Sequence, residues 1–451
     1  MDNNRILDSR RLISQNKAPY KNYIKNCLIA MKRATLIRKL IIISIILASF
    51  IYSTKAGETP VTIKPYGYVS YEILYDTYRS HDTRDGELYL FPQRPVFDIN
   101  GNDINKRSKL NMLAVQSRFG INISGPDVFG AQTTARIEAD FFATHQDYVR
   151  LLRLRHAFVR LQWESTELIL GNTFHPTFVL DCFPSTVSFA AAVPFHPLNR
   201  SPQIRLTQDF ASDFSASVSF LMHGYHNSAG PNDQQRNSGL PDSQLQLRYN
   251  PANLLLGVTA GYKFLSPRDV TGGNVATSKN VGSYNLQAFS KITTLPVTMK
   301  FEALYGENMS NFVMIGGYGA KGTPEDGINP DFWNSDYDYA NLKTLSLWTD
   351  IHSNSKVLQW GLFAGYTENL GSDDPFLTIL GAGLLRYADL HYLYRVSPRL
   401  TYFASKNFSF GAEVAYYSAV YAEEFDIKRK PTQSMDPAIN YHTILFAKYT
   451  F

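Results

Sequence analysis

The stretch that decides the fold is LAVQSRFGINISGPDVFGAQTTARIEADFF, residues 113–142. Two segments in which apolar and polar residues alternate flank GPDVFG at 125–130, which is rich in turn-forming residues. Alternation predicts a β-strand with two different faces, because successive side chains point to opposite sides. In the first segment we place Val115, Phe119, Ile121 and Ile123 on an apolar face, and Gln116, Arg118, Gly120 and Asn122 on a polar face.

The following segments repeat this pattern. From 131 to 141 the apolar face carries Ala131, Ala135, Ile137, Ala139 and Phe141, and the polar face carries Gln132, Thr134, Arg136, Glu138 and Asp140. In LLRLRHAFVRL, residues 151–161, the pattern sets Leu152, Leu154, His156 and Phe158 against Arg153 and Arg155. Each segment is about ten residues long, which suits a strand that crosses a bilayer.

Short and long connections alternate along the chain. Seven short ones lie at 125–130, 164–166, 211–213, 250–253, 293–296, 353–355 and 405–407. Eight mostly long ones lie at 77–111, 144–149, 172–202, 226–242, 266–280, 308–336, 369–389 and 420–438. Fifteen connections join sixteen strands, and strict alternation places all the short ones at the same end of an up-and-down sheet.

This layout predicts an all-β fold, a transmembrane antiparallel β-barrel of about 16 strands with short periplasmic turns and long extracellular loops. Lipid offers no hydrogen bonds to a sheet edge, so the sheet must close. At this strand number the interior is wide enough for water to enter. The alternative is a secreted β-sandwich or propeller, whose strands are shorter and whose dry core would not accept unpaired charges.

The first 56 residues have a different character. MKRATLIRK, from Met31, is basic, and the apolar run that follows, Leu40 to Tyr52, is too short for a transmembrane helix. Thr54 and Ala56 then suit a cleavage site. We predict a cleaved secretory signal peptide at 31–56, with an uncleaved anchor as the alternative. Residues 1–30 are interpreted as a mis-assigned upstream extension, and 57–451 as the transmembrane β-barrel domain.

Charge and cysteine content exclude several functions. The formal net charge is +5, but residues 57–451 hold 33 basic and 37 acidic residues. There is no basic face for nucleic acid. Neither Cys27 nor Cys182 is interpreted as a metal ligand. Only Cys182 stays after cleavage, so no internal disulfide can form, and a lone cysteine is expected to be an inert buried thiol. No catalytic constellation, metal site or cofactor motif stands out, and DINGNDIN at 98–105 resembles a calcium loop only weakly.

Charged residues on the polar faces must point into the barrel, because a charge facing lipid at mid-depth costs about 2–4 kcal/mol. Ten cations and five carboxylates fall there. They either brace the wall in cross-strand pairs or form a basic ladder that favours anionic solutes. The predicted pore-lining residues are Arg118, Arg136, Glu138, Asp140, Arg153, Arg155, Arg205, Arg248, Lys300, Arg395, Arg399 and Lys448.

The third long connection, 172–202, is far more apolar than the others. A loop of this composition should not extend into water. We expect it to fold into the barrel and narrow the pore, or alternatively to pack on a neighbouring subunit or on the rim. The predicted constriction residues are Phe178, Asp181, Phe183 and Arg200.

The segment HTILFAKYTF, 442–451, alternates up to Phe451. We predict that it is the sixteenth strand, that it pairs with the strand near YGYVSYEILYD (66–76), and that Lys448 faces the lumen. The terminal aromatic resembles the signal by which the barrel-assembly machinery recognises its substrates.

The run QSRFGINISGPDVFG…TARIEADFF…LLRLRHAFVRL resembles the start of DcaP-like and related general porins of Gram-negative bacteria. Over about 60 residues the shared positions are Arg118, Phe119, Gly120, Gly125, Pro126, Glu138, Asp140, Arg153, Leu154, Arg155, His156, Ala157 and Gly171. The resemblance implies a sixteen-stranded homotrimer whose third long loop folds inward, and small hydrophilic, often anionic, solutes. Phosphate-selective relatives use more lysine than this arginine-led lumen.

Together these features predict a non-enzymatic porin of the outer membrane for passive diffusion of small hydrophilic, anionic solutes. The alternative is a surface-binding barrel with a closed pore, whose long outer loops hold a ligand or polysaccharide.

Overall fold

The computed structural model describes residues 60–379 and 381–451. The predicted upstream extension, the signal peptide and Cys27 lie outside the described residues. Contacts divide the chain into two units, one of Met1–Thr59 with Asp127–Gly130 and one of Pro60–Pro126 with Ala131–Phe451. The second unit holds the sheet. In the described part of the chain, no helix has the length and apolar character needed to cross a bilayer.

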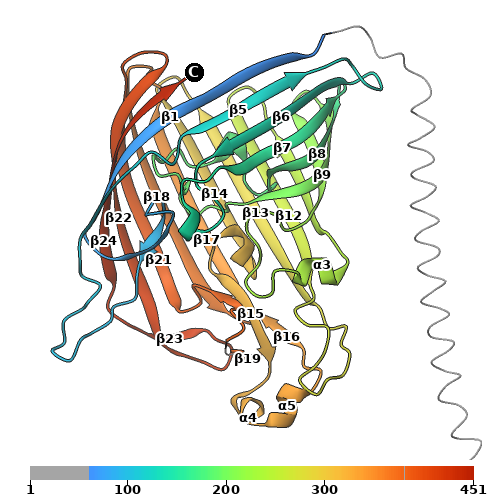
Figure 1. The fold of residues 1–451 in the computed structure, drawn as a ribbon, viewed down its shortest axis with the longest axis vertical. Coiled ribbons are helices and arrows are strands. Elements are labelled where there is room, and N and C mark those ends of the chain that lie inside the picture. Colours follow the sequence, from blue (N-terminus) through green and yellow to red (C-terminus); the bar gives the residue numbers. More distant parts are fainter. Residues whose placement is uncertain (1–59, 380) are drawn as a thin grey trace, which may run out of the picture. The chain divides into compact units, whose positions relative to one another are not determined.

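Sixteen antiparallel strands pair in sequence order and form a closed ring, as the alternation predicts (Figure 1). The second strand of the ring is interrupted and consists of two pieces, β4 and β5. Both pieces pair with β1, β4 with its C-terminal half and β5 with its N-terminal half. The order is β1 (Thr62–Asp76), β4 (Lys109–Leu113) with β5 (Arg118–Ser124), β6 (Gln132–Asp140), β7 (Arg153–Gln162), β8 (Thr166–Phe174), β9 (Arg200–Ala211), β10 (Phe214–Leu221), β11 (Asp242–Tyr249), β12 (Leu254–Leu265), β13 (Val281–Thr293), β14 (Val297–Glu307), β17 (Lys343–Ser353), β18 (Leu358–Gly371), β21 (Leu390–Phe403), β22 (Phe408–Phe425) and β24 (Ala438–Thr450).

The ring closes between β24 and β1. Their register runs from Tyr68 opposite Thr450 to Asp76 opposite His442. Beyond the last pair, the Gly67 amide donates to the Phe451 carbonyl at 3.1 Å and the Phe451 amide donates to the Gly67 carbonyl at 3.0 Å. The predicted pairing of the last strand with the first is therefore present.

The connections alternate as predicted, with the short turns gathered at the end where the C-terminus lies and the long loops at the other (Figure 1). The long loops contain the smaller elements: β2 (Ser80–Thr83), β3 (Leu88–Pro92), η2 (Gln146–Tyr148), η3 (Leu180–Cys182), α3 (Gln234–Ser238), η4 (Met309–Phe312), β15 (Gly316–Lys321), α4 (Pro324–Gly327), α5 (Pro330–Asn334), β16 (Tyr339–Asn341), β19 (Phe376–Leu377), β20 (Leu385–Arg386) and β23 (Pro431–Ser434).

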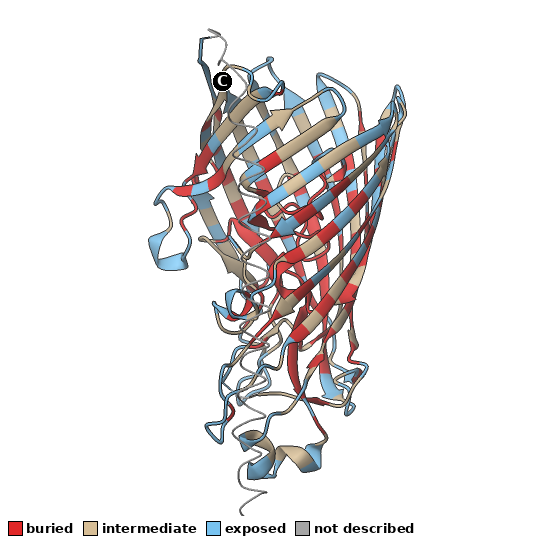
Figure 2. Cartoon of the chain, turned by 90° about the vertical axis from the view of Figure 1, so that its right-hand side faces the viewer, coloured by how far each residue is buried: buried red, intermediate tan, exposed pale blue. Residues whose placement is uncertain are grey.

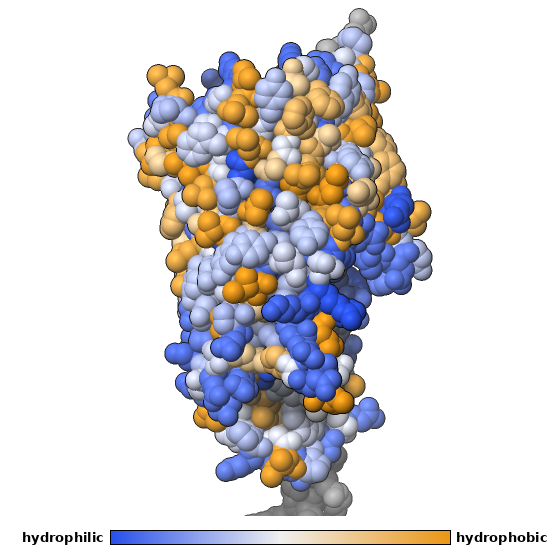
Figure 3. All heavy atoms as spheres, turned by 90° about the vertical axis from the view of Figure 1, so that its left-hand side faces the viewer, coloured by the Kyte–Doolittle hydropathy of each residue, from blue (hydrophilic) through white to orange (hydrophobic). Residues whose placement is uncertain are grey.

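Side-chain burial alternates along the strands (Figure 2). On β24, Tyr441 and Leu445 are exposed to the outside, whereas His442 and Ile444 are buried. Over β21–β24 the outer surface is apolar towards the short turns and hydrophilic over the long loops (Figure 3). This is the amphipathic wall expected of a barrel that has lipid on one side and a polar interior on the other.

The predicted orientation of Val115 is wrong. Val115 is buried inside the barrel with Leu113 and Phe142, whereas Phe119 is 46% exposed on the outside. Residues 114–117 interrupt the strand between β4 and β5, and the Ser117 hydroxyl there accepts from the Ser70 amide. An irregularity of this kind reverses the phase of the alternation.

The predicted orientation of His156 and Phe158 is also wrong. The register between β6 and β7 shifts between Glu138 and Ala139, which leaves Arg155 as an extra residue on β7. Arg155 and His156 therefore both point inward and are buried. Phe158, two residues later, lines an internal cavity.

The third long loop folds into the barrel, as predicted. Its residues from Phe178 to Leu198 form a buried apolar cluster with Tyr89 and Phe91 of the first loop and with Trp348 and Phe363 of the wall. This cluster fills the interior next to β12, β13, β17, β18, β21, β22 and β24. Open internal space is left along β5–β11.

Candidate functional site

The barrel has two cavities of about 750 Å³ each, one along β5–β9 and β11 and one among the long loops. The first, here called the turn-side cavity, has arginine as its commonest charged residue. It is lined by five arginines, Arg118, Arg136, Arg160, Arg205 and Arg248, and by three carboxylates, Glu138, Glu167 and Asp181.

The second, here called the loop-side cavity, is formed by the first, fourth, sixth and seventh long loops. Its charged lining consists of Arg84, Arg386 and Asp389, with Tyr225 and His226 beside them. Both cavities therefore carry an excess of positive charge.

Arg153 and Arg155 are buried and fully paired. Arg155 donates to Glu138 at 2.6 Å and to one oxygen of Asp140 at 2.8 Å. Arg153 donates to the same Asp140 oxygen at 3.0 Å and also to the other oxygen of that carboxylate. The Arg118 guanidinium lies 3.6 Å from Glu138. Paired charges in such a network largely offset one another. These cations therefore brace the barrel wall, in addition to contributing to the electric field inside the barrel.

Arg200, the first residue of β9, has a different environment. Its side chain is 3% exposed, and no carboxylate of the described residues lies within salt-bridge distance. Its guanidinium carbon is 4.6 Å from the ring centroid of Phe174 and 6.0 Å from that of Tyr225. Since Phe174 lines the turn-side cavity and Tyr225 the loop-side cavity, Arg200 lies between the two.

The surroundings of Arg200 are strongly positive. The Nε of Arg200 has no hydrogen-bond partner among the described residues. Burial, and then the charges of Arg386 and Arg200, hold the pKa of His226 in the fourth loop well below its ordinary value. A buried cation without a counter-ion is costly, so this position is suited to attract an anion.

The other constriction residues divide into two groups. Phe178 and Asp181 line the turn-side cavity, and Asp181 forms an ion pair with Arg248 across it. Phe183 stacks on Phe178 at a centroid distance of 5.6 Å, behind the cavity wall.

The third loop is anchored to the wall by polar contacts. His196 lies 3.2 Å from Glu302, the Val187 amide donates to Glu413 at 2.7 Å, and Gln287 donates to the Thr177 carbonyl at 2.7 Å. Burial raises the pKa of the Cys182 thiol in this loop to about 12, which agrees with the expected inert thiol.

The remaining predicted pore-lining residues have different partners and lie in different parts of the barrel. Arg136 donates to Asn122 at 2.9 Å, and Arg205 to the Phe174 carbonyl at 2.7 Å, both in the turn-side cavity. On the far wall, Arg395 pairs with Glu413, Arg399 with Asp350 at 2.7 Å, and Lys300 donates to the Phe183 carbonyl at 2.9 Å. Lys448 stacks at 4.7 Å from the ring of Tyr68. A pore-lining role for each of these residues stays a prediction.

Sequence reasoning missed Arg84, Arg386 and Arg160. Arg84 and Arg386 lie in loops, where no alternation indicates which way a side chain points. Arg160 follows the bulge at Arg155, which reverses the expected phase of β7.

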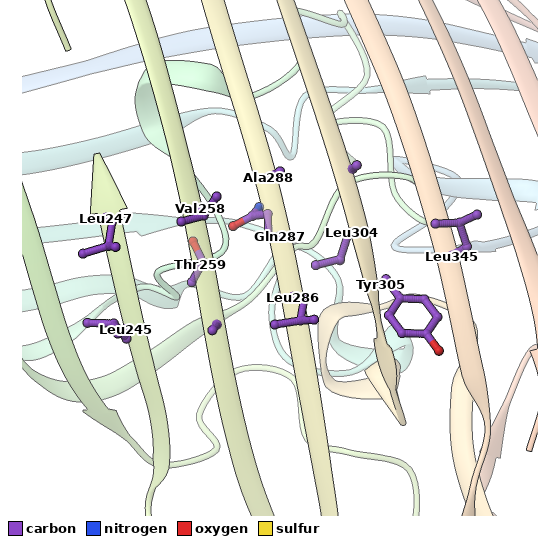
Figure 4. Close-up of a pocket in the computed structure, with 12 residues that line it drawn as sticks. Leu245, Leu247, Val258, Thr259, Leu286, Gln287, Ala288, Leu304, Tyr305 and Leu345 are labelled. Carbon is purple, nitrogen blue, oxygen red and sulfur yellow. The ribbon is translucent and has the colours of Figure 1, made fainter. Parts of the chain in front are cut away.

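The outside of the barrel has an apolar groove of about 460 Å³ over β11–β14 and β17 (Figure 4). Leu245, Leu247, Leu286 and Leu345 border it, and Ala288 pairs with Ala303 across two strands. The groove exists because the alanine side chains are small. Its apolar lining has few groups that could form hydrogen bonds with a hydrophilic solute.

No protein-family model matches this sequence, and no curated protein matches it either. Similarity is found among solved structures. The outer-membrane channel DcaP of Acinetobacter baumannii superposes with a TM-score of 0.62 at 14% identity, over 88% of this chain and 100% of that one.

The fold is that of a DcaP-like general porin. An anion-selective porin from Comamonas acidovorans has a TM-score of 0.53 at 10% identity, over 87% of this chain and 100% of that one. OmpT of Vibrio cholerae has a TM-score of 0.51 at 10% identity, over 88% and 99% of the two chains. These porin folds agree with the resemblance seen in the residues around Arg118 and Arg153.

Proposed function

We propose that this chain is an outer-membrane porin through which small hydrophilic solutes, preferentially anions, diffuse down their gradients. A closed sixteen-stranded barrel with charged internal cavities supports the porin role. The anion preference rests on one observation above all, the buried and uncompensated guanidinium of Arg200 between two arginine-lined cavities. Fixed positive charge in a narrow, poorly solvated path raises the local anion concentration.

The proposal includes the cellular setting. The chain would be exported by a cleaved signal peptide, inserted into the outer membrane by the barrel-assembly machinery through the strand that ends at Phe451, and assembled as a homotrimer. A solved structure of Vibrio cholerae OmpT is described as a trimer form, which supports the oligomeric part.

A second candidate function follows from the loops. The first and third long loops together bury Tyr89, Phe91 and Phe195 inside the barrel. This core would suit a surface-binding barrel with a closed pore, whose outer loops hold a ligand.

Purified protein in a planar bilayer distinguishes the two. The porin proposal expects stable open steps and a reversal potential of anion-selective sign in a KCl gradient. Folded protein that leaves the bilayer silent would contradict the porin and favour the closed barrel.

A further inference from the structure

Two buried carboxyl groups lie where the first long loop meets the barrel wall. Glu72 points inward from β1, and Glu87 comes directly before β3 in the first loop. The two residues are 2% and 4% exposed, and the Oε2 atom of each has no hydrogen-bond partner among the described residues. No cation in that part of the chain forms a salt bridge with either carboxylate.

The other oxygen of each carboxyl group has one polar partner. The Gln116 side chain donates to Glu87 at 3.0 Å, and the Ser70 hydroxyl donates to Glu72. Gln116 belongs to residues 114–117, which interrupt the strand between β4 and β5. The interruption therefore directs a side-chain amide towards the first loop.

The cations near this pair do not neutralise it. Lys448 of β24 acts on both carboxylates, but its ammonium lies over the Tyr68 ring at 4.7 Å. Lys109 of β4 pairs with Asp82 of the first loop at 2.6 Å. Two adjacent carboxylates in such a site repel one another when both are ionised, whereas one shared proton joins them in a strong, charge-assisted hydrogen bond.

The turn that precedes Glu87 has a strained backbone. Arg84, Asp85 and Gly86 have φ angles of 60°, 61° and 99°, a left-handed region that is unfavourable for residues other than glycine. Outside the barrel core the turn is held by the exposed side chain of Gln146, which donates to the Asp85 carboxylate at 2.8 Å. Glu87 provides its buried attachment.

The same turn forms part of the loop-side cavity. Thr83, Arg84, Leu88 and Leu90 of the first loop line this cavity. Strand β3, which follows the turn, is held in the buried apolar cluster with the third loop. A movement confined to the turn would therefore widen the cavity and displace one of its two arginines.

We propose that Glu72 and Glu87 form a proton-operated latch that holds the turn at 83–87 against the barrel wall. This inference rests on the proposed porin function and adds a means of regulating it. With one proton shared, the turn stays in place and narrows the loop-side cavity. When the pair loses this proton, the two carboxylates repel each other, the strained turn moves away and the cavity widens.

The direction of the pH effect follows from which state holds the proton. The latched state binds it and the released state gives it up, so rising pH shifts the population towards the released state. Burial, and then the carboxylate of Glu72, raise the pKa of Glu87 to about 8. The channel should therefore be latched in neutral solution and conduct better in mildly alkaline solution.

Single-channel conductance in a planar bilayer tests the latch between about pH 7 and about pH 9.5. This range avoids the ordinary titrations of histidine, at about 6.5, and lysine, at about 10.4. We expect the wild-type conductance to rise in a step centred near pH 8. Glu87→Gln should keep the low conductance throughout, because its amide donates to Glu72 without a titratable proton.

Glu307→Gln is the matched control. Glu307, the last residue of β14, is a half-buried carboxyl group that accepts from Asn341 at 3.2 Å. This variant should keep the wild-type step. Open wild-type channels whose conductance does not rise over the range would overturn the latch, and so would a wild-type step in Glu87→Gln.

A second measurement follows the turn itself and requires no conduction. With Cys27 and Cys182 replaced by serine, a nitroxide at Thr83→Cys should become more mobile above about pH 8, and adding Glu87→Gln should abolish this change. A nitroxide whose mobility does not change with pH would overturn the latch. A bilayer that is silent at every pH would contradict the porin proposal instead, and the nitroxide would then decide the latch by itself.

Discussion

The guanidinium of Arg200 lies 4.6 Å from the ring of Phe174, and no carboxylate in the described part of the chain pairs with it. The arginines beside it are different, because Arg153 and Arg155 share Asp140 and Glu138. Arg200 is therefore the cation whose charge is least compensated where the two cavities approach each other.

Replacing Arg200 by glutamine should lower the chloride-to-potassium permeability ratio by on the order of tenfold, because a focused field enriches counter-ions by at least that factor. The reversal potential in a KCl gradient measures the change. Lys300→Gln is the matched control, since Lys300 is buried behind the third loop and has no carboxylate within salt-bridge distance among the described residues. An equal effect of both substitutions would mean that Arg200 has no special role.

The anion preference should weaken as salt concentration rises. The Debye length falls from about 10 Å at 0.1 M to about 3 Å at 1 M, so charges that act through the water of the cavities are screened. The test is to measure the reversal potential at a fixed ratio of KCl concentrations across the bilayer while the mean KCl concentration is raised. A preference that does not change with salt would point to direct binding rather than to the field.

Asp140→Asn should destabilise the barrel by about 3–5 kcal/mol, because it leaves the buried Arg153 and Arg155 without a shared carboxylate. Urea unfolding in micelles measures the loss. Glu167→Gln breaks the ion pair with Arg160, whose side chain is 44% exposed, and should cost no more than about 1 kcal/mol. Similar losses for the two variants would contradict the buried network.

Burial, and then the nearby carboxylate of Glu72, raise the pKa of Glu87 in the first loop to about 8 from 4.5. Gln116 donates to Glu87 at 3.0 Å, and Lys448 is the opposing cation. The folded state holds this proton more tightly than the unfolded state, so stability contributed by the neutral carboxyl falls as pH rises from about 4.5 to about 8. Thermal unfolding should show this slope, and Glu87→Gln should reduce it; an unchanged slope would exclude Glu87 as its source.

The alternation predicted the strands because a wall with lipid outside and water inside imposes a period of two on every strand. It could not predict the bulge at Arg155, since the same letters read as a regular strand until the register with Glu138 is known. The alternation also could not predict which charged side chains form ion pairs with one another. Both Arg153 and Arg200 lie against aromatic rings. Only the neighbouring strands reveal that Arg153 also has a carboxylate partner and that Arg200 has none among the described residues.

The most direct test of the central claim is the reversal potential of purified wild-type protein in a planar bilayer under a KCl gradient. The account predicts open channels with a potential of the sign that chloride permeation produces, and a smaller potential for Arg200→Gln. Open channels with a potential of potassium-selective sign would contradict it.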